Sequence, residues 1–296
     1  QEPGVFTTNL LNNPKQLQVD IRGSGETAPS NVLFLIDGRR INSIDMSGAD
    51  LSQISLEMIE RVEIYRGPAT VLFGDNAITG VINFILKKGK GKPKVSAGLL
   101  AGSDGMFAPK LSVSGKQDKL AYYVLVSSYD TEGYRHNNSI FMKDIFGSFI
   151  FDAFKNLSIS LKTGHHRDTS GMSGALSFAD LTTGRYGRTD SKKPDDSSNT
   201  EDNFVDLGAD IKFGDNITFS VNGSYRLRHS SSTYISSNWY SMRTFETYGV
   251  TPKISVNTPL LSFKNTFVAG FDYYRYPTKS SDFSPGIWAT DSTTKI

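Results

Sequence analysis

The chain has 296 residues and a formal net charge of +2, and it contains 38% hydrophobic and 21% charged residues. The near-neutral charge gives no support to nucleic-acid binding, and the absence of cysteine excludes a disulfide framework and a thiolate metal site. These averages suit a water-soluble globular protein, but an outer-membrane barrel gives the same averages because its strands alternate apolar and polar residues.

No segment of the sequence predicts a membrane helix. The longest aliphatic and aromatic run is about five residues, Val32 to Ile36, whereas a helix needs about 20 apolar residues to cross a bilayer. The opening residues, QEPGVFTTNL, lack the basic start and apolar core of a signal peptide, and the chain closes on the polar run DSTTKI. We therefore expect a mature or shortened chain, and a fragment in particular.

The first region, up to about Gly91, combines short strands with one helix candidate. The segment QVDIRG alternates apolar and polar residues, and NVLFLIDGRRI is an apolar run that ends in an Asp-Gly turn signal. Leu51, Ile54 and Met58 lie at helical spacing, and a two-residue period follows from Arg61. The sequence predicts a small α+β domain over residues 1–91.

Three glycines punctuate the segment YRGPATVLFGDNAITGVINF, residues 65–84. A phosphate-binding loop is excluded because no Lys-Ser/Thr pair follows a glycine and the G-x-G-x-x-G pattern is absent. Gly67 and Pro68 instead predict a turn that closes one strand, Gly74 begins a second turn, and Gly80 opens the next strand. The glycines therefore indicate chain reversals in a compact domain.

The second region, residues 92–296, consists of long alternating segments. NITFSVNGSYRLRH, FVDLGADIKF and NLSISLKTG each place apolar residues on one face and polar residues on the other. Their lengths suit the ~9–11 residues that a tilted membrane strand requires. We expect antiparallel strands, about nine of them up to the segment NTFVAGFDYYRYP.

The connections between these strands differ in length. GKQDK, FKN and FGDN predict tight turns, whereas DTEGYRHNNS, residues 167–201 and HSSSTYISSNWYS are long polar segments. Short turns on one rim and long loops on the other are typical of outer-membrane barrels. A soluble β-sandwich also alternates and stays open as the alternative at this point.

Three segments of the first region together resemble the plug domain of TonB-dependent outer-membrane receptors. They are IRG at 21–23, LFLIDGRRI at 33–41 and IERVEIYRGPATVLFGDNAITGVINFILKK at 59–88, and the resemblance covers residues 5–90. It implies a plug domain at 1–91, followed at 92–296 by the N-terminal part of a transmembrane β-barrel. A complete barrel of this family has about 22 strands around its plug.

The resemblance also implies a function. Such a receptor lies in the bacterial outer membrane, surrounded by outer-membrane lipid, and imports a scarce extracellular small molecule with energy supplied through the TonB protein. We expect a ferric siderophore as cargo, and neither an enzymatic activity nor a cofactor beyond a transported metal chelate. Cobalamin or haem receptors of the same family, a passive porin or adhesin, and a soluble carbohydrate-active protein are the alternatives.

Two arginines stand just before glycines at strand ends, Arg22 and Arg66. Solvated strand ends are the simple interpretation. The resemblance implies instead that both face the inner barrel wall and pair with carboxylates there, which makes them a candidate lock between plug and barrel.

The resemblance further places the outward tips of the plug at residues 24–30 and 42–49, where they form a binding floor with the long loops. The candidate ligand-facing residues are Ser24, Glu26, Asn42, Asp45, Tyr134, Trp239 and Tyr240. For the aromatic residues, a place in the membrane-interface girdle is the alternative. The sequence predicts no metal site, since the four histidines (His136, His165, His166 and His229) are expected to be exposed near the outer ends of strands. A contribution of these histidines to holding a metal chelate stays open as the alternative.

Overall fold

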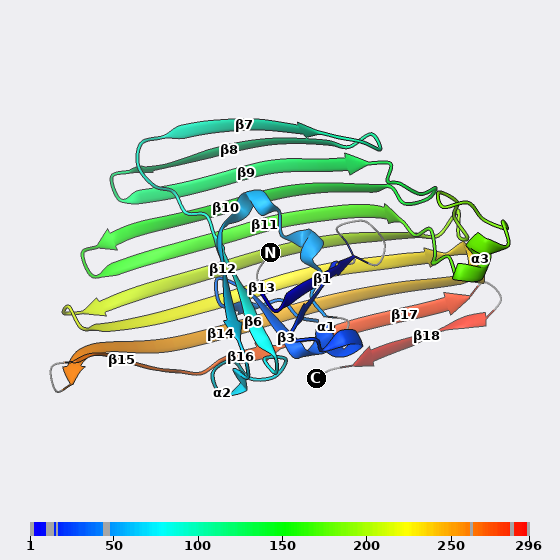
Figure 1. The fold of residues 1–296 in the computed structure, drawn as a ribbon. Helices are drawn as coiled ribbons and strands as arrows, with labels where there is room; N and C mark the ends of the chain where they lie inside the picture. The colour runs from blue at the N-terminus through cyan, green and yellow to red at the C-terminus, as the bar shows by residue number, and fades with distance from the viewer. Residues whose placement is uncertain are drawn as a thin grey trace.

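The computed structural model describes residues 3–9, 15, 17–43, 48–260, 263–284 and 287–294. It contains an N-terminal unit of short elements, which we call the plug, and one long antiparallel sheet, which we call the wall; the plug lies in front of the middle strands of the wall (Figure 1). The plug elements are β1 (Val5–Asn9), β2 (Leu17–Ile21), α1 (Ala28–Asn31), β3 (Val32–Ile36), β4 (Arg39–Arg40), β5 (Ile59–Arg66), α2 (Thr70–Phe73) and β6 (Gly80–Leu86). The wall elements are β7 (Lys94–Ala101), β8 (Phe107–Gln117), β9 (Leu120–Thr131), β10 (Ile140–Phe154), β11 (Leu157–Gly171), α3 (Phe178–Thr182), β12 (Ser197–Phe213), β13 (Ile217–Tyr234), β14 (Trp239–Leu260), β15 (Phe263–Gly270), β16 (Tyr273–Arg275), β17 (Thr278–Ser284) and β18 (Ile287–Thr294).

The plug is built on a four-stranded sheet in the order β4-β3-β6-β5, in which β3 and β6 are parallel. All five side chains of β3 are buried, because both faces of this strand are covered. Leu33 and Leu35 pack with Val81 in one cluster, while Phe34 packs on the other side in a cluster that includes Phe146 of the wall. The apolar run that predicted this strand thus ties the plug to the wall.

The predicted helix around residues 51–58 is wrong. Two short 3-10 turns, Leu51–Gln53 and Leu56–Met58, occupy this segment instead. Each begins at a polar residue, Asp50 or Ser55, whose side chain accepts a hydrogen bond from a backbone N–H two residues on, and such local bonds compete with a continuous helix. In the described part of the chain, no helix is long and apolar enough to span a membrane.

The segment 65–84 reverses the chain between β5 and β6, which pair antiparallel. Gly67, with a φ of 111°, ends β5, and its N–H donates to the carbonyl of Thr79 at 2.9 Å. A one-turn helix, α2, which the sequence did not predict, follows and ends at Gly74. Gly80 begins β6, and a Cβ there would lie 2.6 Å from the Tyr65 carbonyl oxygen and 2.7 Å from Ile21 Cδ1.

Replacing Gly80 with alanine should therefore destabilise the plug. The added methyl group would force β5 and β2 away from β6, and we expect the free energy of unfolding to fall by about 1–3 kcal/mol. Urea titration of the detergent-solubilised protein measures this change. Gly223→Ala is the matched control, because a Cβ at Gly223 in β13 meets no atom within 4 Å. Equal stability of the two variants would contradict the close packing at Gly80.

The wall is a 12-stranded antiparallel sheet among the described residues. From β7 to β14 each strand pairs with the next in sequence, and β14 then pairs along its length with β15, β16 and β17 in turn. β7 to β14 are eight neighbouring strands. β15 and β16 together occupy a ninth position, because both pair with the same side of β14. The fold class predicted from the sequence, a plug followed by about nine barrel strands, is confirmed.

The two rims of the wall differ as predicted, but one predicted loop is wrong. Residues 118–119, 155–156 and 214–216 form short turns, while residues 132–139 and 172–196 form longer connections at the rim that carries α3 (Figure 1). The segment 229–241 is mostly strand, since only residues 235–238 separate β13 from β14. Beyond the lipid both strand faces are wet, so a polar Ser/Thr segment continues the ladder without apolar alternation.

The polar face of the wall is the buried one. On β12, Asp202 is buried on the plug side, whereas Val205 and Leu207 on the opposite face are 40% and 56% exposed. A soluble sandwich buries its apolar faces against each other, so the observed pattern excludes that alternative. Apolar side chains outward and polar side chains inward are the arrangement of a transmembrane barrel.

Candidate functional site

The interface between plug and wall is lined by charged side chains. Among the described residues, five ion pairs cross it: Lys15–Asp168, Asp37–Lys162, Arg39–Asp206, Asp50–Arg228 and Glu57–Lys110. The plug contributes acids in three pairs and bases in two, so the contact depends on the matching of individual pairs and not on a single sign of charge. Most of these side chains are half-buried or buried, so removal of one partner should strongly lower the stability of the docked plug.

Arg226 lies at the centre of this interface. It is buried on β13, and its Nε lies 2.9 Å from both carboxylate oxygens of Asp202 on β12. Its terminal nitrogen donates to the side-chain oxygen of Gln53 in the plug at 2.5 Å. Arg226 therefore joins two wall strands to the plug.

Arg228 lies two residues further along β13 on the same face. Its terminal nitrogen donates to a carboxylate oxygen of Asp50 in the plug at 2.5 Å. The other carboxylate oxygen of Asp50 accepts from the backbone N–H of Ser52 at 3.1 Å and from its hydroxyl at 2.6 Å. The capping of the first 3-10 turn thus fixes the carboxylate for Arg228. A local sequence signal, Asp-Leu-Ser-Gln, produces both the turn and the contact.

The Asp50 carboxyl gives the interface a defined pH dependence. Burial alone would raise its pKa, but the charge of Arg228, with Lys15 and Ser52, lowers the pKa from 3.8 to about 2. A lowered pKa means that the carboxylate stabilises the docked plug above about pH 4, and that this contribution is lost as the pH falls through 2. The shift corresponds to about 2 kcal/mol.

We expect protection of the plug from protease to weaken as the pH falls from 4 to 2, measured with an acid-active protease on the detergent-solubilised protein. Asp50→Asn removes this titration, so its protection should be weaker at pH 5 and should change less toward pH 2. If protease protection changed with pH in the same way in the parent protein and the variant, Asp50 would not couple the plug to the wall.

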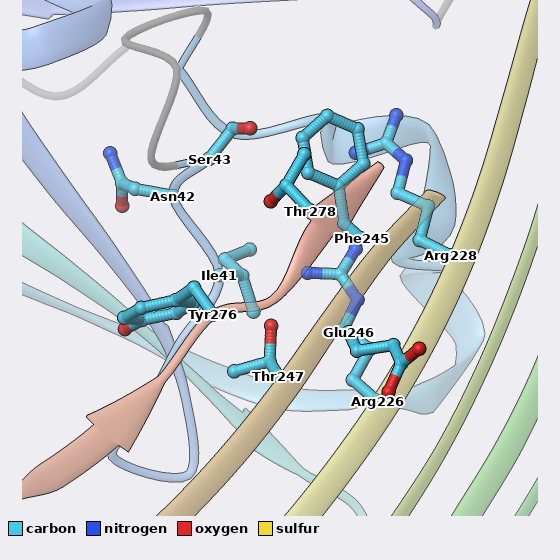
Figure 2. A pocket seen from close by; sticks show the side chains of 10 residues that line it. All are labelled: Ile41, Asn42, Ser43, Arg226, Arg228, Phe245, Glu246, Thr247, Tyr276 and Thr278. Atoms are coloured by element: carbon cyan, nitrogen blue, oxygen red, sulfur yellow. The ribbon is translucent and has the colours of Figure 1, made fainter. Parts of the chain in front are cut away.

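Two cavities flank Arg228 at the plug–wall boundary. The smaller, about 20 Å³, lies between Ile41, Asn42 and Ser43 of the plug and side chains from β13, β14 and the segment leading into β17, as Figure 2 shows. The larger, about 320 Å³, is lined by Lys15, Gln18 and Asp50 together with apolar residues of the plug. This volume falls at the lower end of the range of small-molecule sites.

The structure brings the two predicted plug tips together. Pro29 lies against Gly48, where a Cβ would be 2.9 Å from the proline Cβ. Ser24 donates its backbone N–H to Asp20 at 2.7 Å, and Glu26 is exposed in the next turn. Asp45, the remaining charged candidate of the tips, lies outside the described residues.

Asn42 has a structural role that the sequence did not reveal. Its side-chain oxygen accepts from the N–H of Phe34 at 2.7 Å, and its amide donates to the carbonyl of Val32 at 2.9 Å. The buried amide thereby holds the segment that follows β4 against β3. Although Asn42 lines the smaller cavity, its hydrogen bonds are directed at β3.

The three aromatic candidates have different positions. Tyr134 is 50% exposed in the loop 132–139, and Trp239, which begins β14, is 41% exposed. Tyr240 stacks on Phe283 with ring centroids 5.1 Å apart. Alternation along β14 places it on the same face as Tyr248, the outward face of the wall, so Tyr240 does not face the lumen.

The candidate lock residues lie elsewhere in the plug. Arg22 is exposed with a φ of 66°, and its guanidinium lies beside Gly67; Arg66 is exposed at the end of β5. The five ion pairs described above are made by other residues. The lock role of Arg22 and Arg66 therefore stays a prediction.

The expectation that all histidines are exposed is wrong for His166. This residue lies inside β11 and is buried, with Nδ1 2.7 Å from Asp144 and Nε2 3.1 Å from Asp168. Both ring nitrogens are occupied by carboxylates, which leaves neither for a metal. Among the residues that the structure describes, no group of three or more His, Asp or Glu side chains could hold a metal ion.

The comparison with known proteins agrees with this architecture. Residues 1–81 match the family model of the TonB-dependent receptor plug domain. The vitamin B12 transporter BtuB of Photobacterium profundum is 33% identical over 152 residues, which cover 50% of this chain and 23% of that protein.

Solved structures share the fold. The unliganded ferric citrate transporter FecA superposes with a TM-score of 0.81 at 19% identity, covering 99% of this chain and 47% of that one. The ferric yersiniabactin uptake receptor FyuA from Yersinia pestis gives 0.79 at 16% identity, covering 97% of this chain and 46% of that one. The chain thus spans less than half the length of each of these relatives.

A plug domain docked on the inner face of transmembrane strands defines an outer-membrane receptor of the plugged-barrel class. Residues 1–81 match the plug-domain family of the TonB-dependent receptors, and the chain shares the fold of solved receptors of this class. These matches confirm the predicted location in the bacterial outer membrane. They also agree with the prediction that the chain is not an enzyme, because the relatives named above are transporters and a receptor.

Proposed function

We propose that this protein imports a nutrient from outside the cell across the outer membrane, with energy supplied through the TonB protein. The observation that carries the proposal is the plug docked on the buried polar face of the wall, held by the five ion pairs and by Gln53 at Arg226. A plug in this place obstructs passive flow along the wall. Passage of a nutrient then requires the plug to move, and that movement needs an energy source.

The proposed cargo is a ferric siderophore. The larger cavity carries the basic groups of Lys15 and Arg228, which suit the anionic oxygens of an iron chelate, although Asp50 offsets part of this charge. FecA and FyuA are named for ferric citrate and ferric yersiniabactin. Vitamin B12 is the second candidate, favoured by the similarity to BtuB over half of the chain.

The test is a gene deletion followed by uptake of radiolabelled cargo, with a panel of ferric siderophores and with cobalamin. We expect the deletion strain to lose uptake of at least one ferric siderophore and a plasmid copy to restore it. Loss of cobalamin uptake alone would identify vitamin B12 as the cargo and would contradict the assignment of a siderophore. Normal uptake of every compound in the panel would contradict an importer of either kind.

A further inference from the structure

The outward face of the wall is ordered in horizontal rows, because residues directly opposite each other in the antiparallel ladder share a face. Four successive rows nearest the short turns are free of charged side chains across β10 to β14 and include Phe151, Ile159, Leu161, Leu207 and Val250. In the fifth row, His165 and Asn203 hydrogen-bond to each other at 2.8 Å. Glu246, on β14 in the same row, accepts from the Tyr248 hydroxyl at 2.8 Å. The four apolar rows face lipid, and the polar side chains of the fifth row find these partners within the wall.

The sixth row is strongly charged. The register aligns Lys143 on β10 with Arg167 on β11, Glu201 on β12, His229 on β13 and, through Thr244, Lys279 on β17. All five side chains are exposed. We call Lys143, Arg167, His229 and Lys279 the basic row; Glu201 is the single acid among them.

Two cations of the basic row stand directly opposite each other. Lys143 and Arg167 are cross-strand partners on the same face, and like charges in this position are destabilising. The Lys143 ammonium lies 5.0 Å from the centre of the Phe141 ring on the same face, which draws it toward the rim. Neighbouring acids are Glu201 beside Arg167, Asp130 opposite Phe141 and Glu246 one row nearer the apolar band. An anion bridging Lys143 and Arg167 would relieve their repulsion.

The height of the basic row matches a membrane boundary. From Leu157 in the first row to Arg167 the strand advances ten residues, about 33 Å at about 3.3 Å per residue. A strand tilt of about 40° converts this into about 25 Å along the barrel axis, the height of the apolar band of outer-membrane barrels. The row lies toward the rim with the longer loops, which is the extracellular side in such barrels.

We propose that the basic row binds the phosphate groups of lipids in the outer leaflet, with Lys143 and Arg167 as the central pair. A phosphate offers several anionic oxygens, and Arg and Lys supply charge-assisted donors for them. Lys279 extends the same line of charge beyond His229, so that neighbouring headgroups are held along the barrel. This contact is independent of the cargo and of the movement of the plug.

The test compares the full-length protein in neutral detergent with the variant Lys143→Gln/Arg167→Gln, using bisphosphorylated lipid A as the probe and native mass spectrometry as the readout. Each basic residue near an anionic headgroup contributes roughly a fivefold gain in binding, so we expect the double variant to bind about 25-fold more weakly. Lipid A without its phosphates should bind both proteins equally weakly.

Lys116→Gln/Lys119→Gln, at the short-turn rim, is the matched control with the same loss of charge, and it should keep the parent affinity. Salt dependence of lipid A binding by the unmodified protein needs no variant, and the affinity should fall as salt is raised. The proposal is overturned if the double variant keeps the parent affinity, if the control loses as much, if removal of the phosphates has no effect, or if binding is independent of salt.

Discussion

Truncation of Arg226 to alanine should lower the free energy of unfolding by about 3–5 kcal/mol, the largest single-residue effect that we expect in this protein. The change leaves Asp202 as a buried carboxylate without its guanidinium partner and removes the hydrogen bond to Gln53 of the plug. Both the wall and its contact with the plug lose their central connection. Urea unfolding in detergent, followed by tryptophan fluorescence, measures the effect.

Two further variants separate the buried pair from a general effect of charge. Arg188→Ala removes an exposed arginine of the loop 172–196 and should change the stability by less than about 0.5 kcal/mol. Arg226→Met/Asp202→Leu replaces both buried charges by apolar groups and should recover much of the loss, because no uncompensated charge remains. If Arg226→Ala were as mild as Arg188→Ala, the central place of Arg226 would be wrong.

A disulfide between plug and wall should abolish import. Ser55 lies between the two 3-10 turns of the plug, and its hydroxyl is 3.4 Å from that of Ser127 on β9. Residues 1–296 contain no cysteine, so Ser55→Cys/Ser127→Cys places a single cysteine pair in this part of the protein. Under oxidising conditions we expect uptake to fall to background, because a plug fixed to the wall cannot yield a path for cargo.

Addition of a reductant should restore uptake in the same cells, and each single cysteine variant should transport normally with or without the reductant. A mobility shift on a non-reducing gel shows how much of the protein is cross-linked. Undiminished uptake by fully cross-linked protein would mean that cargo passes without separation of Ser55 from Ser127.

Sequence reasoning predicted the elements whose order of apolar and polar residues follows directly from which of their faces are buried. The apolar run of β3 and the two-residue period of β5 appear where expected, and the alternating segments of β11, β12 and β13 form wall strands. Predictions failed where a local hydrogen bond or a change of solvent overrides the pattern. The capped 3-10 turns after Asp50 and Ser55 replaced a helix, and polar Ser/Thr segments continued as strands beyond the lipid.

The interface between plug and wall was less accessible to sequence reasoning. Alternation assigned Arg226 and Arg228 to the polar face of their strand, but it did not say which residues cover that face. The partners Asp50 and Gln53 lie more than 170 positions away in the chain, and no spacing rule connects such residues. His166 was missed for the same reason, since only the strand register brings Asp144 to its side.

The central claim, energised import, is tested most directly by the dependence of uptake on TonB. Cells that express the full-length gene are compared with and without a functional TonB protein, and the uptake of the radiolabelled cargo identified by the gene deletion is followed over time. The account predicts accumulation against a gradient in cells with TonB and only surface binding in cells without it. Equal accumulation in both strains would contradict the account and would indicate a passive barrel.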